Sequence, residues 1–356
     1  MKKFWKGLLI ALACLLAAVL VYAGYVFAYA GNRIGDQELT VGGQGTARVE
    51  QGKEYTVLSF NMGFGAYEAD YGFFMDGGTE SRAWSRERLE KNLQRIAAFT
   101  QQQAADLTLI QEVDLDATRS YHVDERTVLT DALGQSSSYT WAQNYRSAYL
   151  LYPITEPHGA SVSGILTFSR FPITAARRVE LPVEKGVVKV LDLDRCYSVQ
   201  RIPAGDRELV VYNLHLSAYT SDGTIANRQL ELLLADMEAE YEKGNCCIAG
   251  GDFNKDLLGD SSAYFGEADR DYTWAQPIPE SVFDAAAHIR LAAPFDEAAP
   301  VPSCRNADGP YHQGQYVLTV DGFLVSDNVE VLSAQVVDTG FAYSDHNPVK
   351  LTFRLP

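Results

Sequence analysis

Apolar and polar positions recur with two different spacings along the chain. Residues 85–103 and 225–242 repeat apolar side chains at intervals of three and four, which predicts two amphipathic helices. Short apolar runs bounded by polar or turn residues predict strands. These runs cover residues 55–60, 107–112, 164–168, 208–214, 246–250, 316–325, 329–337 and 348–355. Because no internal repeat or second domain boundary interrupts the pattern, we expect one sheet-rich α/β domain.

A long apolar segment precedes this pattern. Residues 7–30 carry no charge and follow Lys2, Lys3 and Lys6. The run has the length of a membrane helix, whereas the apolar part of a signal peptide is usually about 7 to 15 residues. This favours an uncleaved anchor over residues 1–30. The alternative is a removed signal, because Ala28-Tyr29-Ala30 also has the small-x-small form of a cleavage site.

The lysines before the apolar segment predict its orientation. Positive residues remain on the cytoplasmic side, so residues 31–356 are expected beyond the cell membrane, held by a single span. Residues 31–54 are rich in glycine and polar side chains and are expected to be a linker. The catalytic domain is then expected over residues 55–356.

Charge changes the expected partners. The formal net charge is −16, and the first 33 residues hold four basic residues and no acid, so the remainder carries 26 basic and 46 acidic residues, a net −20. Proteins that bind long nucleic acids draw most of their affinity from a basic surface. The acidic balance therefore argues against long nucleic acid as the main partner.

The five cysteines do not form a disulfide framework. Cys14 lies in the apolar segment, and Cys246 and Cys247 are adjacent in an apolar run, where we expect small buried side chains. A Cys196–Cys304 pair is left open.

Polar residues stand at the ends of several predicted strands, in a recurring order. Taken singly, each is explained by a turn, a cap or an ion pair. The order is Asn61, then Gln111-Glu112, Asn213-Leu214-His215, Gly251-Asp252-Phe253-Asn254, Asp321 and finally Ser344-Asp345-His346. With this succession the chain resembles the endonuclease/exonuclease/phosphatase superfamily, the DNase I-like fold, over about residues 55–354.

The resemblance implies a fold and a metal site. The fold is a four-layer α/β sandwich in which two mixed β-sheets pack face to face with helices outside, and the active site lies at one edge. Glu112 corresponds to the family's metal ligand, and Asn61 lies beside it in the metal site, in contact with metal-bound water or phosphate. The cofactor is Mg²⁺ or alternatively Mn²⁺. His346 corresponds to the general base and Asp321 to the carboxylate that holds its tautomer.

Four further roles are implied by the resemblance. His215 contacts the scissile phosphate, Asp252 positions the attacking water and Asn254 donates to phosphoryl oxygens. Asp345 orients a neighbour or completes the metal shell. Gly322 stands where relatives often have an aromatic residue, so a different pocket wall is expected there. The implied reaction is in-line attack of water on phosphorus without a covalent intermediate.

Weaker candidates lie outside these motifs. Arg119 and Arg170 follow predicted strands and are candidates for phosphate binding, with a surface ion pair as the alternative for each. His158 is a candidate for the edge of the cleft. The aromatic loop of residues 67–74 either shapes the substrate entrance, touches lipid or packs internally.

The expected function is hydrolysis of a phosphate ester. A phosphodiester of a phospholipid-type or small-molecule substrate is the first choice, because an anchor keeps the site near lipid and the acidic surface disfavours DNA. An exported Mg²⁺-dependent nuclease is the enzymatic alternative, and a strongly electropositive groove would favour it. A pseudoenzyme that binds a phosphorylated ligand or a partner protein is the third alternative, and it requires a site residue that is missing or misplaced. Monoester or diester preference and oligomeric state are left open.

Overall fold

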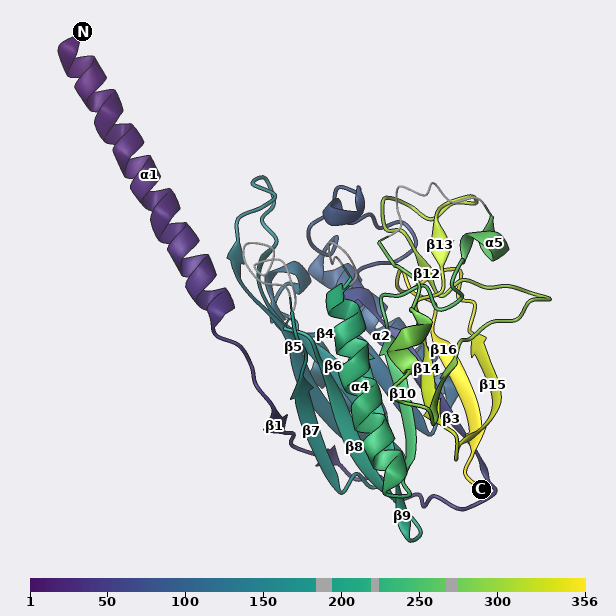
Figure 1. The fold of residues 1–356 in the computed structure, drawn as a ribbon. Helices are drawn as coiled ribbons and strands as arrows, with labels where there is room; N and C mark the ends of the chain where they lie inside the picture. Colours follow the sequence, from purple (N-terminus) through teal and green to yellow (C-terminus); the bar gives the residue numbers. More distant parts are fainter. Residues whose placement is uncertain (184–193, 219–223, 267–273) are drawn as a thin grey trace.

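Two mixed β-sheets of seven strands each face one another in the computed structural model, which describes residues 1–183, 194–218, 224–266 and 274–356. Helices cover the outer faces of both sheets (Figure 1). The predicted four-layer α/β sandwich is therefore confirmed.

The first sheet is covered on its outside by helix α4 (Thr224–Glu242), whose Leu230, Leu233 and Met237 pack against it. Only β9 and β10 are parallel neighbours among its described strands. Across the sheet the strands are β1 (Gln37–Glu38), β7 (Ala175–Glu180), β8 (Cys196–Ala204), β9 (Arg207–His215), β10 (Cys246–Asp252), β14 (Asp321–Ser326) and β11 (Ile289–Ala292).

The second sheet is covered by α2 (Arg86–Gln103) and α3 (Glu125–Leu133). Ser85 begins α2 by accepting a hydrogen bond from the Arg88 N–H, the usual role of serine at a helix N-terminus. Among the described strands, β3 and β4 form the parallel pair. In order they are β15 (Glu330–Val336), β16 (Val349–Arg354), β3 (Glu54–Asn61), β4 (Leu107–Ala117), β6 (Gly159–Ser169), β5 (Ser138–Leu150) and β2 (Gly42–Gly43).

Short elements complete the loops. They are β12 (Cys304–Arg305), β13 (Val317–Leu318), α5 (Ser262–Phe265) and the 3-10 turns η1 (Gly63–Gly65), η2 (Phe74–Asp76), η3 (Thr118–Ser120), η4 (Gly134–Ser136) and η7 (Glu280–Phe283). The single strand predicted over residues 316–325 is wrong, because β13 and β14 are separate. Between them the carbonyls of Thr319 and Val320 accept from the N–H groups of Leu257 and Phe253, in the loop after β10.

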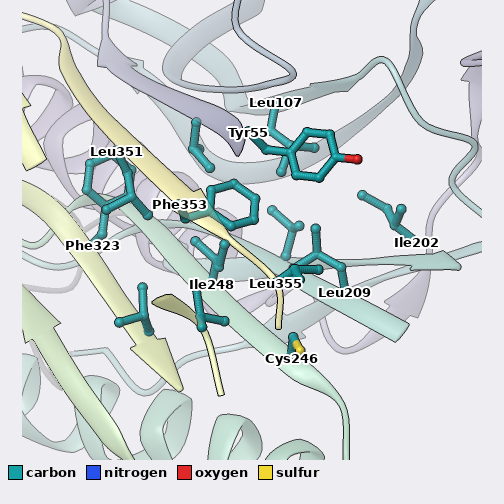
Figure 2. Close-up of a cluster of buried hydrophobic side chains, with 14 of the residues drawn as sticks. Tyr55, Leu107, Ile202, Leu209, Cys246, Ile248, Phe323, Leu351, Phe353 and Leu355 are labelled. Atoms are coloured by element: carbon teal, nitrogen blue, oxygen red, sulfur yellow. The ribbon is translucent and has the colours of Figure 1, made fainter. Parts of the chain in front are cut away.

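The main core lies between the two sheets (Figure 2). Tyr55, Leu107 and Phe353 come from one sheet and meet Ile248 and Phe323 of the other. Successive side chains of a strand point to opposite faces. In β9, Leu209 and Val211 accordingly enter this core, whereas Val210 and Tyr212 pack toward α4. Both faces of the central strands are thus buried.

The same alternation explains the adjacent cysteines. Cys246 faces the core between the sheets and Cys247 faces α4, so the two thiols lie on opposite faces of β10. The prediction of small buried side chains is confirmed. All five cysteines are free, so Cys196 and Cys304 do not pair.

The apolar N-terminal segment forms α1 (Lys2–Gly31), an exposed helix with a mean hydropathy of 2.5 in its most apolar stretch. Its length and composition fit a membrane span, and a signal sequence would meet the same criteria. Residues 31–54, expected as a linker, run along the sheets and supply β1 and β2. Leu39 and Val41 of this segment pack against the main core.

Candidate active site

Strand ends from both sheets meet at one edge of the sandwich. In the first sheet the register places Asp252, at the end of β10, beside His215 of β9 and Asp321 of β14. In the second sheet Asn61, the last residue of β3, is paired with Gln111 of β4. Because β14 runs antiparallel to β10, its first residue reaches the edge where the other strands end.

A cavity of about 210 Å³ opens at this edge. Seven of the eight predicted site residues line it, and Asp321 lies behind His346. The seven are Asn61, Glu112, His215, Asp252, Asn254, Asp345 and His346. Residues separated by up to 285 positions along the chain are thereby brought together.

Asn61 bridges the two sheets at the centre of the site. Its Nδ2 donates to Asp252 Oδ2 at 3.0 Å and lies 3.4 Å from Glu112 Oε1. Its Oδ1 accepts from the Gly63 N–H at 3.0 Å. In this orientation Asn61 presents a hydrogen-bond donor to the cavity, which suits the expected contact with metal-bound water or phosphate, whereas direct metal ligation would need its oxygen there.

Glu112 reaches the cavity through an irregularity in β4. The register with β6 shifts between Ile110 and Val113, and Glu112 has a φ of +57°. A bulge of this kind re-aims a side chain that a regular strand would place differently. Burial raises the pKa of Glu112, and the Arg119 guanidinium, 3.8 Å from Oε2, partly opposes that increase.

His346 and Asp321 form a buried pair. His346 Nδ1 lies 2.8 Å from Asp321 Oδ2, which also accepts from Ser303 Oγ at 2.8 Å. Burial alone would lower the pKa of His346, but the Asp321 carboxylate raises it well above the usual value. His346 Nε2 faces the cavity, 3.4 Å from Asn61 Nδ2, 3.6 Å from Cys304 Sγ and 3.8 Å from Asp252 Oδ2.

His215 and Asp252 lie side by side deeper in the site. His215 Nε2 is 3.4 Å from Asp252 Oδ2, and within the described ranges the buried His215 Nδ1 has no hydrogen-bond partner. Burial and then the nearby Arg195 lower the pKa of His215, so that the imidazole is neutral. Burial raises the pKa of Asp252.

Asn254 and Asp345 complete the predicted set. The Asn254 backbone N–H donates to Asp252 Oδ1 at 2.8 Å, and its Nδ2 donates to the Leu216 carbonyl at 2.7 Å. Asn254 therefore fixes the Asp252 carboxylate. Asp345 Oδ1 accepts from Ser344 Oγ at 3.1 Å, and burial raises its pKa.

The donor set fits a divalent cation. The ligand atoms of Asp252, Asp321 and His346 lie within 4.8 Å of one another, and Glu112 lines the same cavity. Burial raises the pKa values of Glu112 and Asp252, so their negative charge is only partly compensated by neighbouring protein groups. Hard carboxylate oxygens are the ligands that Mg²⁺ and Mn²⁺ prefer.

Three arginines line the cavity. Arg119, a weaker candidate from the sequence, makes two bonds to Asp114 and stacks over the Phe64 ring at 4.0 Å. Arg195 and Arg305 were not predicted. Neither ends a predicted strand, and Arg305 is held by the Glu68 and Tyr71 carbonyls, 237 and 234 positions away, so no local pattern could have marked it.

Three other expectations have clear outcomes. Arg170 pairs with Asp106 at 3.1 Å and is not among the cavity residues, which supports the ion-pair alternative. His158 does line the cavity. The altered pocket wall expected at Gly322 is wrong: a Cβ there would meet Leu257 and Pro294, and neither of these lines the cavity.

Comparisons with known proteins point to one family. The sequence profile of the Endonuclease/Exonuclease/phosphatase family matches residues 58–346. The endonuclease/exonuclease/phosphatase from Beutenbergia cavernae DSM 12333 is 17% identical, with a TM-score of 0.55 over 85% of this chain and 72% of that one. A family protein from Leptotrichia buccalis C-1013-b is 12% identical, with a TM-score of 0.56 over 85% of this chain and all (100%) of that one.

The structure also resembles that of a human protein. The Nocturnin catalytic domain is 16% identical, with a TM-score of 0.52 over 89% of this chain and 98% of that one. No curated protein gives a significant match. At such low identities the solved structures show a shared fold.

Proposed function

We propose a function that proceeds from one premise: the chain belongs to the endonuclease/exonuclease/phosphatase family. The proposed activity is hydrolysis of a phosphate ester by water, with residues 55–356 as the catalytic domain. The observation that carries it is the buried His346–Asp321 pair, whose second imidazole nitrogen, Nε2, faces a cavity shared with Glu112 and Asp252.

His346 is the proposed general base. Asp321 accepts the hydrogen bond from Nδ1–H and fixes the tautomer, so that Nε2 of the neutral imidazole takes a proton from water as the water attacks phosphorus. Asp252, 3.8 Å from Nε2, accepts the second hydrogen bond of that water and orients it. The products are a phosphate or phosphomonoester and the released alcohol, with no covalent enzyme intermediate.

Donors around the cavity hold the phosphoryl group. Asn61 and His215 face the position of the phosphate, and Asn254 and Asp345 hold the loops that carry them. Glu112, with Asp252 or Asp345, would hold Mg²⁺ or Mn²⁺, which would neutralise charge on the phosphoryl oxygens. Asn61, whose amino group faces these carboxylates, is assigned to phosphate or metal-bound water in preference to direct ligation.

The proposed location is the cell membrane, with the catalytic domain on the extracytoplasmic side and residues 1–30 as a single-span anchor. The exposed apolar helix α1 and the lysines before it support this orientation. The proposed substrate is a phosphodiester of a phospholipid-type or small molecule. A cavity of about 210 Å³ suits a head group, and the −20 charge beyond the first 33 residues disfavours long nucleic acid.

The test uses the full chain in detergent. Phospholipids, bis(4-nitrophenyl) phosphate and DNA are offered with Mg²⁺ or with EDTA, to the wild type, to His346→Ala and to the control Arg170→Ala. Metal-dependent turnover of a lipid or small ester that His346→Ala loses and Arg170→Ala keeps supports the proposal.

Three outcomes point elsewhere. Preferential DNA cleavage favours the exported nuclease. Turnover that survives His346→Ala refutes the proposed base, and binding of phosphate esters without any turnover favours the pseudoenzyme, although all eight predicted residues are present.

A further inference from the structure

A second, apolar pocket of about 280 Å³ adjoins the catalytic cavity. The two share Met75, Tyr145 and His158 as walls. The second pocket is lined by Tyr22, Phe74, Met75, Tyr145, Leu150, Leu151, Tyr152 and His158. A molecule with its phosphate in the catalytic cavity could therefore extend an apolar part into this pocket without leaving the protein surface.

His158 does not bring charge into the shared wall. It is buried, its Nδ1 lies 3.0 Å from the Ser81 carbonyl and its ring contacts Phe73 and Phe74. Burial and then Arg119 lower the pKa of His158 to about 4. The neutral ring leaves the second pocket suited to hydrocarbon.

Helix α1 forms one wall of the apolar pocket. The Tyr22 hydroxyl donates to the Tyr149 carbonyl at 3.0 Å and accepts from the Leu151 N–H at 3.0 Å. The Tyr25 hydroxyl accepts from the Tyr149 N–H at 3.3 Å. The end of β5 is thus fixed to α1 by hydrogen bonds between its backbone and the two tyrosine hydroxyls.

The position of these tyrosines along α1 sets the level of the membrane. An apolar core of about 30 Å is spanned by about 20 residues at roughly 1.5 Å each. Counted from Lys6, the far interface falls near Tyr25. Tyrosine favours the head-group region, where its ring is in the apolar layer and its hydroxyl finds polar partners. The end of β5 therefore lies at the level of the outer head groups.

The segment between β5 and β6 exposes large apolar side chains at this level. Tyr152 is 69% exposed and Ile154 is 86% exposed, and Leu151 and Met75 are also exposed. Figure 1 shows that the loop joining β5 to β6 extends toward the same side of the sheets as helix α1. Exposed apolar side chains grouped beside a substrate pocket are typical of a membrane-binding surface.

We propose that residues 150–158 and the Phe74–Met75 turn enter the outer head-group region of the membrane that holds α1, and that the apolar pocket receives the hydrocarbon part of a phospholipid substrate. This inference rests on the proposed function and narrows its substrate class. The phospholipid passes from the bilayer into the site with its phosphate facing His346 and its acyl part facing Tyr22 and Tyr152.

Membrane contact is tested without reference to activity. Cys14 is the exposed cysteine and the other four are buried, so Cys14→Ser allows a spin label to be placed at one introduced cysteine. The label is placed by Ile154→Cys or, as a control, by Leu332→Cys on β15, at the opposite side of its sheet from β5. The full chain is reconstituted in vesicles of phosphatidylcholine and phosphatidylglycerol.

The expected readout is collision of the label with oxygen, which partitions into lipid, against collision with a water-soluble nickel complex. The label at position 154 should collide mainly with oxygen and the label at 332 mainly with nickel. Equal exposure of both labels to nickel overturns the proposed membrane contact.

The substrate class is tested with Ile154→Asp and the control Leu332→Asp. Ile154 does not line either cavity. Hydrolysis of phosphatidylglycerol in vesicles should fall at least tenfold in Ile154→Asp, while hydrolysis of soluble bis(4-nitrophenyl) phosphate stays within twofold. Leu332→Asp should leave both rates unchanged.

The outcomes separate this inference from the proposed function. Equal loss on both substrates, or no loss on vesicles, overturns the inference. Wild-type turnover of the soluble ester with no turnover of any phospholipid in vesicles overturns the substrate class and leaves the proposed hydrolase standing. Failure to hydrolyse any ester refutes the proposed function itself, while the spin-label result still decides the membrane contact.

Discussion

The pKa values of buried carboxylates shift in opposite directions at the two ends of the central strands. Near the start of β9 and β10, Glu240 accepts from Arg201 at 2.5 Å, from Lys243 at 2.8 Å and from Asn245 at 2.7 Å. Burial alone would raise the pKa of Glu240, but these bonds lower it to about 2. At the other end of the same strands, burial prevails and raises the pKa values of Asp252 and Glu112.

The difference separates structural charge from functional charge. A buried carboxylate surrounded by donors is stabilised in its ionised form and fastens elements together, here α4 to β8 and β10. Carboxylates with too few protein donors are costly to the fold unless a ligand supplies positive charge. The Glu240 end therefore serves stability, whereas the edge proposed as catalytic holds carboxylates whose charge a bound cation would compensate.

The largest effect expected from this contrast is a loss of activity at the catalytic edge. His346→Ala should lower kcat by about 10²–10⁴-fold, the usual contribution of a positioned general base. The protein should remain folded under assay conditions, although the buried Asp321 carboxylate loses His346 and keeps only its bond from Ser303, which lowers the free energy of unfolding. Steady-state kinetics and urea unfolding measure both. A variant that loses stability in proportion to activity would make the pair structural.

The next effect is on stability and lies at the Glu240 end. Glu240→Ala should lower the free energy of unfolding by about 3 kcal/mol, because it leaves buried donors without their acceptor. Activity per folded molecule should be unchanged. Urea unfolding followed by circular dichroism, together with kinetics on the folded fraction, provides the measurement. Glu208→Ala, at the exposed side of Arg201, is the matched control and should cost much less. A loss of kcat in Glu240→Ala would remove the contrast.

Metal removal should lower stability through Glu112 at the catalytic edge and not through Glu240 at the other end. At about 100 times its dissociation constant, Mg²⁺ should stabilise the wild type by about 2.7 kcal/mol relative to EDTA. Glu112→Gln should lose most of that gain and be at least as stable as the wild type in EDTA, because a buried charge is gone. Thermal unfolding across a Mg²⁺ titration tests this, with Glu240→Gln expected to keep the full gain. Equal stabilisation of Glu112→Gln would place the cation elsewhere.

The smallest effect is a dependence on pH whose sign differs between the ends. The folded pKa of Glu240, about 2, lies below its ordinary 4.5, so its stabilisation is present above 4.5 and is lost as pH falls through 2. The wild-type advantage over Glu240→Gln should shrink by about 2 kcal/mol between about pH 5 and pH 3.

Glu112 should show the opposite sign. The folded pKa of Glu112 is raised, so its ionisation destabilises the metal-free fold. The free energy of unfolding of the wild type should therefore increase relative to that of Glu112→Gln as pH falls. Unfolding in EDTA at several pH values measures the difference in free energy of unfolding between the wild type and each Gln variant. If both differences change in the same direction with pH, the two ends do not differ in how they compensate charge.

The succession of short polar motifs beside strands reveals the candidate site residues, whereas residues outside these motifs stay hidden in the sequence. Asp252 follows a continuous apolar run, and the two-residue period of buried strands makes such an ending visible. β5 was not predicted, because polar side chains such as Gln143, Asn144 and Arg146 interrupt its alternation. Arg195 and Arg305 enter the cavity through contacts between distant segments, and the positive φ of Glu112 is set by pairing with β6. None of these has a local signature.

The place of β16 in the second sheet governs when the protein can fold during its synthesis. β16 lies between β15 and β3, and Arg354 pairs with Glu54, 300 positions earlier. At about 5–20 residues per second, a ribosome needs roughly 15–60 seconds to add the intervening chain. During that time β3 lacks β16 on one side and exposes an unpaired edge there. His346 arrives with β16, so an unfinished chain is both prone to aggregate and unable to react with the esters around it.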